Sequence, residues 1–399
     1  MPDLKIYASI IEDEARAQID RLLAQPAFSE CKVRIMPDVH AGAGCVIGFT
    51  ADLGDKVIPN IVGVDIGCGM LTAELGKIDI DYAKLDAVIR KHVPSGMNVH
   101  EGRKAHFPDL VNMYCYRELK DTRRIERSIG TLGGGNHFIE VDQDDEGNKY
   151  LVIHSGSRNL GKQVAQYYQN LAYELLQGKD ELLAAQKELI SRYKAEGRRQ
   201  EIEGALSKLR KNFVLRDTDV PKDLAYLTGE YRDHYLHDMK ICQQYADINR
   251  IVILSSICAH MDLVPVSIFT TVHNYIDHES NIVRKGAVSA RKGERLLIPM
   301  NMRDGSLICI GKGNDDWNQS APHGAGRLMS RTQARETLSV DAFVKCMEGV
   351  YTTSATDDTI DEAPMAYKPM NAILPLLDAT VSTERIIRPV YNFKAGESS

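Results

Sequence analysis

The stretch Asn60-Ile-Val-Gly-Val-Asp-Ile-Gly-Cys-Gly-Met70 constrains the fold more than any other part of the sequence. A Val/Ile-rich run that ends in glycines predicts a buried strand turning into a tight loop. Such a loop can aim Asp65 and Cys68, three residues apart, at one point. A hard oxygen ligand beside a soft sulfur ligand indicates a transition-metal site. A buried turn with Cys68 as a small hydrophobe fits this segment equally well.

The composition limits where such a chain can work. Of its 399 residues, 43% are apolar and 26% are charged, which is typical of a soluble globular protein with a large core. The net charge of -6 excludes a whole-chain basic surface for nucleic acid. Eight scattered cysteines without a CxxC pair argue against a disulfide framework and a zinc ribbon. With no secretory signal and no membrane-length apolar run, we expect a cytoplasmic protein.

The fold class follows from the alternation of elements along the chain. Short β-type runs separated by glycine loops flank two helical blocks, 160–213 and 231–259. We therefore expect an α+β fold, with a compact body of mixed or antiparallel sheets and a helical insertion over about 160–260. No Pro/Gly/Ser linker appears, so residues 1–399 are expected to form a single domain. The polar, partly basic stretch 100–127 also contains five acids and fits a solvated helical face better than a nucleic-acid surface.

Four histidines share one local pattern, since each lies beside glycine or at the end of an apolar strand: His137, His154, His273 and His323. Loops at strand ends are where rigid scaffolds place functional groups. Together with Asp65 and Cys68, these imidazoles can hold two metal ions with the sulfur bridging. Two ions about 4 Å apart can stabilise both the attacking and the leaving oxygen of a phosphoryl transfer. The ligand types alone favour zinc.

The glycine loops also indicate phosphate binding, because runs of backbone N–H groups form anion nests. Side chains that can neutralise phosphate charge are Lys285, Arg291, Arg327 and Arg331. The sequence has neither GxxxxGK[ST] nor GxGxxG after a strand, which excludes a P-loop and a Rossmann cofactor site. It also lacks the GxSxG elbow of serine hydrolases.

An ordered set of motifs that spans almost the whole chain resembles the RtcB family of RNA ligases. The blocks are Pro37-Asp-Val-His40, Gly63-Val-Asp-Ile-Gly-Cys-Gly69, Gly133-Gly-Gly-Asn-His-Phe-Ile-Glu140, His154-Ser-Gly-Ser-Arg158, Val272-His-Asn-Tyr275, Arg284-Lys-Gly-Ala-Val-Ser-Ala290, His323-Gly-Ala-Gly-Arg327 and Ala363-Pro-Met-Ala-Tyr-Lys368. The resemblance implies joining of RNA 3′-phosphate or 2′,3′-cyclic phosphate ends to 5′-hydroxyl ends, with GTP and two Mn²⁺ ions as cofactors.

The resemblance also implies a role for each matched residue. Cys68 would bridge the two Mn²⁺ ions, and His323 would be the nucleophile that takes GMP. The remaining metal ligands would be Asp65, His137, His154 and His273. Phosphates would lie on Asn136, Ser289, Gly324, Ala325, Gly326 and Arg327. Guanine would contact Glu140, Tyr367 and Lys394.

The chain departs from the family pattern after Pro299, where many members carry a glycine-rich phosphate loop. Here the sequence is Met300-Asn-Met-Arg-Asp-Gly-Ser306, which leaves two alternatives: Arg303 and Asp304 replace backbone contacts, or the loop binds differently. Two other functions stay open: a metal-dependent phosphohydrolase that acts on RNA phosphate ends without ligation, and a non-catalytic RNA-binding subunit. The sequence leaves open the natural RNA (tRNA halves or damaged RNA), a requirement for an activating protein partner, and the oligomeric state.

Overall fold

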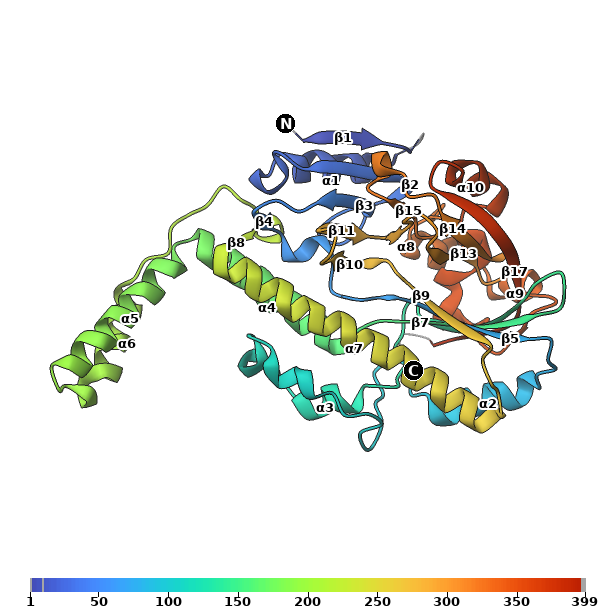
Figure 1. Ribbon diagram of the computed structural model, residues 1–399, viewed down its shortest axis with the longest axis horizontal. Helices are drawn as coiled ribbons and strands as arrows, with labels where there is room; N and C mark the ends of the chain where they lie inside the picture. Colours follow the sequence, from blue (N-terminus) through green and yellow to red (C-terminus); the bar gives the residue numbers. More distant parts are fainter. Residues whose placement is uncertain (1, 9–10, 396–399) are drawn as a thin grey trace.

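The computed structural model describes residues 2–8 and 11–395, and its body is built on two larger sheets (Figure 1). The eight-stranded sheet has the order β13-β14-β17-β6-β7-β5-β9, with β16 added beside β17. Its strands are β5 (Gly69–Gly76), β6 (Phe138–Gln143), β7 (Lys149–Ser155), β9 (Ser267–Val272), β13 (Arg295–Asn301), β14 (Gly305–Gly311), β16 (Tyr351–Thr352) and β17 (Val381–Lys394). All pairings are antiparallel except β16 with β17.

The second sheet has the order β1-β2-β3-β11-β10, and only its β1–β2 pairing is parallel. Its strands are β1 (Asp3–Ile6), β2 (Lys32–His40), β3 (Ile47–Asp52), β10 (Asn274–Asp277) and β11 (Ile282–Lys285). Two small ribbons complete the strands: β12 (Ala287–Ser289) with β15 (Ser320–Pro322), and β4 (Lys56–Val57) with β8 (Leu227–Thr228). Mixed and antiparallel sheets with separate helices confirm the expected α+β class.

The helices differ greatly in length. They are α1 (Asp13–Leu23), α2 (Tyr82–His92), α3 (Thr122–Arg127), α4 (Arg158–Leu176), α5 (Lys179–Ala195), α6 (Ile202–Asn212), α7 (Gly229–Met261), α8 (Arg331–Thr337), α9 (Val340–Cys346) and α10 (Met370–Leu377). With 33 residues, α7 is about 50 Å long. Its first half packs in one hydrophobic cluster through Tyr235 and Met239, and its second half packs in another through Ile253 and Ile257.

The helical region 158–261 is only partly an insertion. Figure 1 shows α5 and α6 as an arm that projects from the body, whereas α4 and α7 lie against it. No residue of α5 or α6 is buried, while eight residues of α4 and thirteen of α7 are buried. The expected insertion over about 160–260 therefore narrows to this α5–α6 arm. Helical periodicity gave no means of separating core helices from projecting ones.

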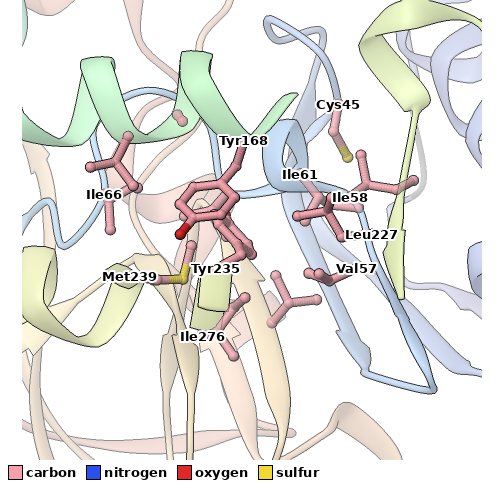
Figure 2. Packing of buried hydrophobic residues seen from close by; sticks show 14 of the residues in the cluster. Cys45, Val57, Ile58, Ile61, Ile66, Tyr168, Leu227, Tyr235, Met239 and Ile276 are labelled. Atoms are coloured by element: carbon pink, nitrogen blue, oxygen red, sulfur yellow. The ribbon is translucent and has the colours of Figure 1, made fainter. Parts of the chain in front are cut away.

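The largest hydrophobic cluster joins α4 and α7 to the loop before β5. In Figure 2, Tyr168 of α4 lies near Tyr235 and Met239 of α7, and Ile66 from the metal-ligand loop packs beside them. Burying such side chains stabilises the fold by about 1.5–3 kcal/mol each relative to leaving them exposed. The core therefore fixes the base of the loop that carries Asp65 and Cys68.

Two further sequence expectations compare directly with the structure. The stretch 100–127 forms two short 3-10 helices and α3, rather than one continuous helical face. Within the described ranges, no helix combines the length and the apolar character that crossing a membrane requires.

Candidate metal and nucleotide site

Cys68 lies at the centre of a cluster of potential metal ligands. Its Sγ atom lies 3.2 Å from Nε2 of His154 and 3.5 Å from Nε2 of His137. Cys68 belongs to two ligand groups, one with His154 and His273 and one with Asp65 and His137, and the ligand atoms of each group lie within 4.8 Å of one another. A thiol that belongs to both groups has the position required of a bridging ligand.

Outward hydrogen bonds fix the orientation of two imidazoles. Nδ1 of His137 donates to the Leu132 carbonyl at 2.8 Å, and Nδ1 of His154 donates to the Asn136 carbonyl at 3.1 Å. The bond of His154 leaves its Nε2 lone pair facing Cys68, and both bonds orient their imidazoles as backbone acceptors do in metal sites. Asp65 reaches His137 with a 2.8 Å contact between Oδ2 and Nε2. A side chain at Gly156 would prevent this, since its Cβ would lie 2.1 Å from Asp65 Oδ1.

The electrostatics of the cluster favour the neutral forms of His154 and His273. Burial lowers the pKa of His154 well below its ordinary value, and the nearby His137 and Lys394 lower it further. Burial also lowers the pKa of His273, assisted by His154 and His323. Burial raises the pKa of the Cys68 thiol well above its ordinary value, and Asp65 adds to the effect. A metal ion must therefore displace the thiol proton, as thiolate ligation generally requires.

Asp65 keeps its charge in this setting. Burial alone would raise the pKa of Asp65, but the charge and hydrogen bond of His137 hold it below the ordinary value. The cluster therefore brings together one carboxylate, one thiol and three imidazoles, all of which can coordinate metal cations. Imidazole suits many transition ions and carboxylate suits Mn²⁺ among others, so this donor set fits a two-ion centre.

The middle of α7 holds the loops that carry these ligands. The fully buried Arg250 donates from Nη1 to the Gly67 carbonyl at 2.8 Å and to the Ser155 carbonyl at 2.7 Å. These carbonyls directly adjoin Cys68 and His154. The neighbouring Asn249 accepts from the Gly130 N–H at 2.8 Å. One helix thus ties together three loops that are distant in the sequence, and neither residue had been assigned a role from the sequence.

His323 lies beside this cluster, and its ring centroid is 5.3 Å from that of His273. Its Nδ1 donates to Oδ2 of Asp38 at 2.8 Å, and its backbone N–H reaches the same oxygen at 3.2 Å. Asp38 is buried in β2. The contact fixes the tautomer of His323 with the Nε2 lone pair free. The motif Pro37-Asp-Val-His40 contained Asp38, but spacing alone gave no reason to pair it with a residue 285 positions away.

A pocket opens next to His323 and extends to β6 and β17. The residues that line it include His323, Gly324, Ala325, Gly326, Arg327, Asn136, Phe138, Glu140, Tyr367, Lys394, Glu362 and Asn392. Nine of the ten residues predicted to bind the nucleotide or to act as the nucleophile therefore line this one pocket. Ser289 is the exception, because it does not line the pocket and its hydroxyl donates to Glu294 at 2.5 Å.

Glu362 organises the far end of this pocket. Its Oε2 accepts from Lys394 Nζ at 2.7 Å and from the Tyr367 hydroxyl at 2.6 Å. Burial would raise the pKa of Glu362, but Lys394 and Arg331 lower it to about 2. Arg327 reaches the Tyr367 hydroxyl at 3.1 Å. Glu362 lies in an ordinary acidic 3-10 turn, so no sequence pattern distinguished it.

The matching relatives decide the family. The family model described as tRNA-splicing ligase RtcB matches residues 18–119 and 115–395. The RNA-splicing ligase RtcB of Escherichia coli K12 is 30% identical, over 95% of this chain and 94% of its own. The chain belongs to the RtcB family. The tRNA-splicing ligases RtcB of Aeropyrum pernix and Archaeoglobus fulgidus are each 25% identical, over 95% and 90% of this chain and 92% and 86% of their own.

The departure from the RtcB pattern after Pro299 has a structural explanation. Asn301 Oδ1 accepts from the backbone N–H groups of Arg303 and Asp304, at 3.0 and 2.8 Å. The turn thus satisfies its own donors and leaves fewer for a phosphate. Arg303 contacts Asp304 and the Cys346 sulfur, so its guanidinium is held away from the pocket residues. The expected replacement of backbone contacts by Arg303 and Asp304 is not seen in this arrangement.

Two of the predicted phosphate-binding cations lie outside the pocket. Lys285 is buried and donates to the Ala43 carbonyl, and burial lowers its pKa. Arg291 pairs with Asp277 and Glu279. Arg327 and Arg331 line the pocket, and Arg331 also pairs with Asp361 and Glu362.

Proposed function

We propose that the protein is an RNA ligase that uses GTP to join RNA 3′-phosphate or 2′,3′-cyclic phosphate ends to 5′-hydroxyl ends. The observation that carries this proposal is the position of His323. Its ring is held by Asp38 and lies between the Cys68 cluster and the pocket lined by Glu140 and Tyr367. Family membership and the names of the relatives support RNA as the substrate.

We assign two Mn²⁺ ions to the Cys68 cluster. Cys68 would contact both ions, with Asp65 and His137 on one side and His154 and His273 on the other. When bound, the ions would supply Lewis-acid stabilisation of phosphate charge. The chain itself contributes the neutral imidazoles of His154 and His273, the ionised Asp65, and the backbone hydrogen bonds of His137 and His154.

His323 acts as a nucleophile in this proposal. Asp38 accepts a hydrogen bond from Nδ1–H, so Nε2 presents its lone pair to the α-phosphorus of GTP. The N–P bond forms as the bond to pyrophosphate breaks. A 2′,3′-cyclic phosphate end is opened to a 3′-phosphate by water, which breaks the P–O2′ bond and leaves a 2′-hydroxyl. An oxygen of the RNA 3′-phosphate then attacks the phosphorus of the His323-bound GMP, which breaks the N–P bond and restores His323. Finally the 5′-hydroxyl oxygen attacks the activated 3′-phosphorus, GMP leaves, and the hydroxyl proton is released to solvent.

Guanine would occupy the pocket end formed by β6 and β17. Glu140 can accept from the N–H groups of the guanine edge, and Phe138 and Tyr367 offer ring faces for stacking. Burial raises the pKa of Glu140 to about 7, despite the Asn392 hydrogen bond and the charge of Lys394. Guanine binding should therefore strengthen as pH rises through about 7, because the ionised carboxylate is the acceptor.

Covalent labelling with α-labelled GTP in the presence of Mn²⁺ tests the proposal. The wild-type protein should take the label, and His323→Ala should lose it while still binding metal. Cys68→Ala should lose both metal and label, because it removes the ligand that the two groups share. Melting curves of both variants confirm that each remains folded. A label that survives in His323→Ala would refute the nucleophile assignment.

The phosphohydrolase alternative predicts a different result. Hydrolysis of phosphate ends needs the metal cluster but no guanylylated histidine. An RNA with a 2′,3′-cyclic phosphate end and an RNA with a 5′-hydroxyl end provide the test. Joined product that requires GTP supports the ligase, and phosphate removal without joining supports the hydrolase.

A further inference from the structure

A second buried acid lies beside Glu140 on β6, and no step of the proposed reaction uses it. Side chains two residues apart in a strand point to the same face, so Asp142 follows Glu140 on the face that also carries Phe138. The partners across from Asp142 and Glu140 on β7 are Tyr150 and Val152, which belong to a cluster of buried apolar side chains. Asp142 itself is 0% exposed. An acid in this apolar setting needs a specific partner.

The Glu140 carboxyl is that partner. Within the described residues, no N–H or O–H group donates to either carboxyl oxygen of Asp142. The side chains of Asp142 and Glu140, however, form a hydrogen bond with each other. Two ionised carboxylates cannot do this, because both offer only acceptors. One of the two carboxyls therefore keeps its proton, and its O–H group donates to the other.

The surroundings decide which carboxyl keeps the proton. Glu140 has groups that favour its ionised form, since Asn392 Nδ2 donates to its Oε2 at 2.6 Å and the charge of Lys394 lowers its pKa. Asp142 has no such donor in the described part of the chain. Burial and the charge of Glu140 raise the pKa of Asp142 well above its ordinary value, whereas the pKa of Glu140 is about 7. The proton therefore belongs to Asp142.

The other titratable groups on the neighbouring strands have partners of their own. On β7, the Tyr150 hydroxyl donates to Asp144 at 3.1 Å, and His154 belongs to the Cys68 cluster. Ion pairs engage the charged side chains of β17 and β5: Arg385 with Asp144, Arg388 with Asp145, Lys394 with Glu362, and Glu74 with Arg295. The protonation of the acid pair is therefore set by the two carboxyls together with Asn392 and Lys394.

We propose that Asp142 is a positioning residue for guanine recognition, a neutral carboxylic acid whose O–H donates to Glu140 and fixes it as the acceptor of the guanine N–H groups. This hydrogen bond favours the ionised form of Glu140. An acid that an apolar site keeps neutral can act as such a donor. Asp142 does not line the pocket, so it acts through Glu140. The inference rests on the proposed function, in which Glu140 contacts the guanine edge.

Infrared spectroscopy of the nucleotide-free protein tests the protonation of Asp142 directly. The measurement is made at pH 8, above the Glu140 pKa of about 7, on protein with carbon-13 in its aspartate carboxyl groups. The spectrum should contain the C=O band of a protonated aspartic acid, and Asp142→Asn should lose this band. Its absence from the wild type, or its persistence in Asp142→Asn, would overturn the inference. Because no GTP is needed, this result is independent of GMP labelling at His323.

The pH dependence of GTP binding tests the positioning role. In a His323→Ala background, which prevents GMP transfer, GTP affinity should rise with pH and level off above about 7. Asp142→Leu removes the donor, so the plateau should begin about one to two pH units higher, the shift expected from losing a hydrogen bond to a charged group. Asp142→Asn should restore the wild-type profile, because its amide N–H groups can donate at every pH.

Thr72→Val is the matched control, because Thr72 is also fully buried in the eight-stranded sheet and its hydroxyl also lacks a partner in the described regions. It should keep the wild-type pH profile, and melting curves show whether each variant is folded. An unchanged profile in Asp142→Leu, or an equal shift in Thr72→Val, contradicts the positioning role. A wild type that takes the GMP label while Asp142→Leu keeps its profile refutes this inference alone and leaves the proposed function standing.

Discussion

At the scale of single residues, Glu362 shows how one buried charge can organise a pocket. Four groups converge on its carboxylate: the Lys394 ammonium, the Tyr367 hydroxyl, and the guanidinium groups of Arg327 and Arg331. Glu362 and Lys394 are both almost fully buried. Removing one partner of such a pair leaves an uncompensated charge in the interior and costs about 3–5 kcal/mol. The conformation of the pocket beside His323 therefore depends on the Glu362 carboxylate.

The pH dependence of the free energy of unfolding should reveal the ionisation of the Glu362 carboxyl. Its pKa is about 2 in the folded protein, below the ordinary value of 4.5. Since the folded pKa is the lower one, the carboxylate stabilises the fold fully above about pH 4.5, and this contribution is lost as pH falls toward 2. Urea unfolding at pH 6 and pH 3.5 measures it. Wild type should lose more stability between these pH values than Glu362→Gln, and equal losses would contradict the assignment.

Residue chemistry made part of the site predictable. Cys68, Asp65 and the four histidines could be found because their residue types are rare beside glycines at strand ends, and the structure brings all six together. Asp38, Glu362 and Arg250 could not be found in this way. Each acts through a partner more than 30 positions away, and only the folded chain defines those pairs.

At the scale of elements, α7 determines the geometry of the site. It runs beneath both hydrophobic clusters and places Arg250 and Asn249 where the loops of Cys68, His154 and Gly130 meet. The sequence predicted this helix within two residues at each end, from 231–259 to the observed Gly229–Met261. It did not predict its role, because the apolar positions of a helix reveal a buried face but not what the face contacts.

Arg250→Lys should loosen these loops while keeping the charge. A lysine ammonium is a point charge without the planar fork that lets Nη1 bind the Gly67 and Ser155 carbonyls while Nη2 pairs with Asp247. We expect Mn²⁺ affinity to fall about 10- to 100-fold, as for other residues that orient metal ligands. Isothermal titration calorimetry measures the affinity. The control is Arg295→Lys, which changes a partly exposed pair with Glu384 and should leave metal binding unchanged.

At the scale of the whole molecule, we propose that residues 1–399 form one ligase domain with the α5–α6 arm as its only appendage in the described regions. The two ends of the arm are adjacent, because the Arg216 N–H donates to the Gln177 carbonyl at 3.0 Å. The arm contributes no buried residue to the core. All the other helices except α8, and both larger sheets, contribute residues to a hydrophobic cluster.

Replacing residues 179–214 with a short Gly/Ser linker should therefore leave the domain folded. The Gln177–Arg216 contact already holds the two ends of the arm together. Shortening the segment between them therefore changes the entropy of loop closure very little. We expect the melting temperature to shift by only a few degrees and GMP labelling of His323 to persist. Calorimetry and the labelling assay measure these. Loss of cooperative unfolding would show instead that the arm belongs to the core.

The place of β17 in the sheet has a consequence for biosynthesis. Residues 381–394 lie between β14 and β6, and they carry Lys394 into the nucleotide pocket. Every other site segment precedes β17 in the chain and leaves the ribosome earlier. Until β17 inserts, β6 and β14 each keep one open edge, and the end of the pocket lined by Glu140 and Lys394 lacks a wall. Under the proposed function, a nascent chain therefore cannot bind GTP before β17 has been synthesised.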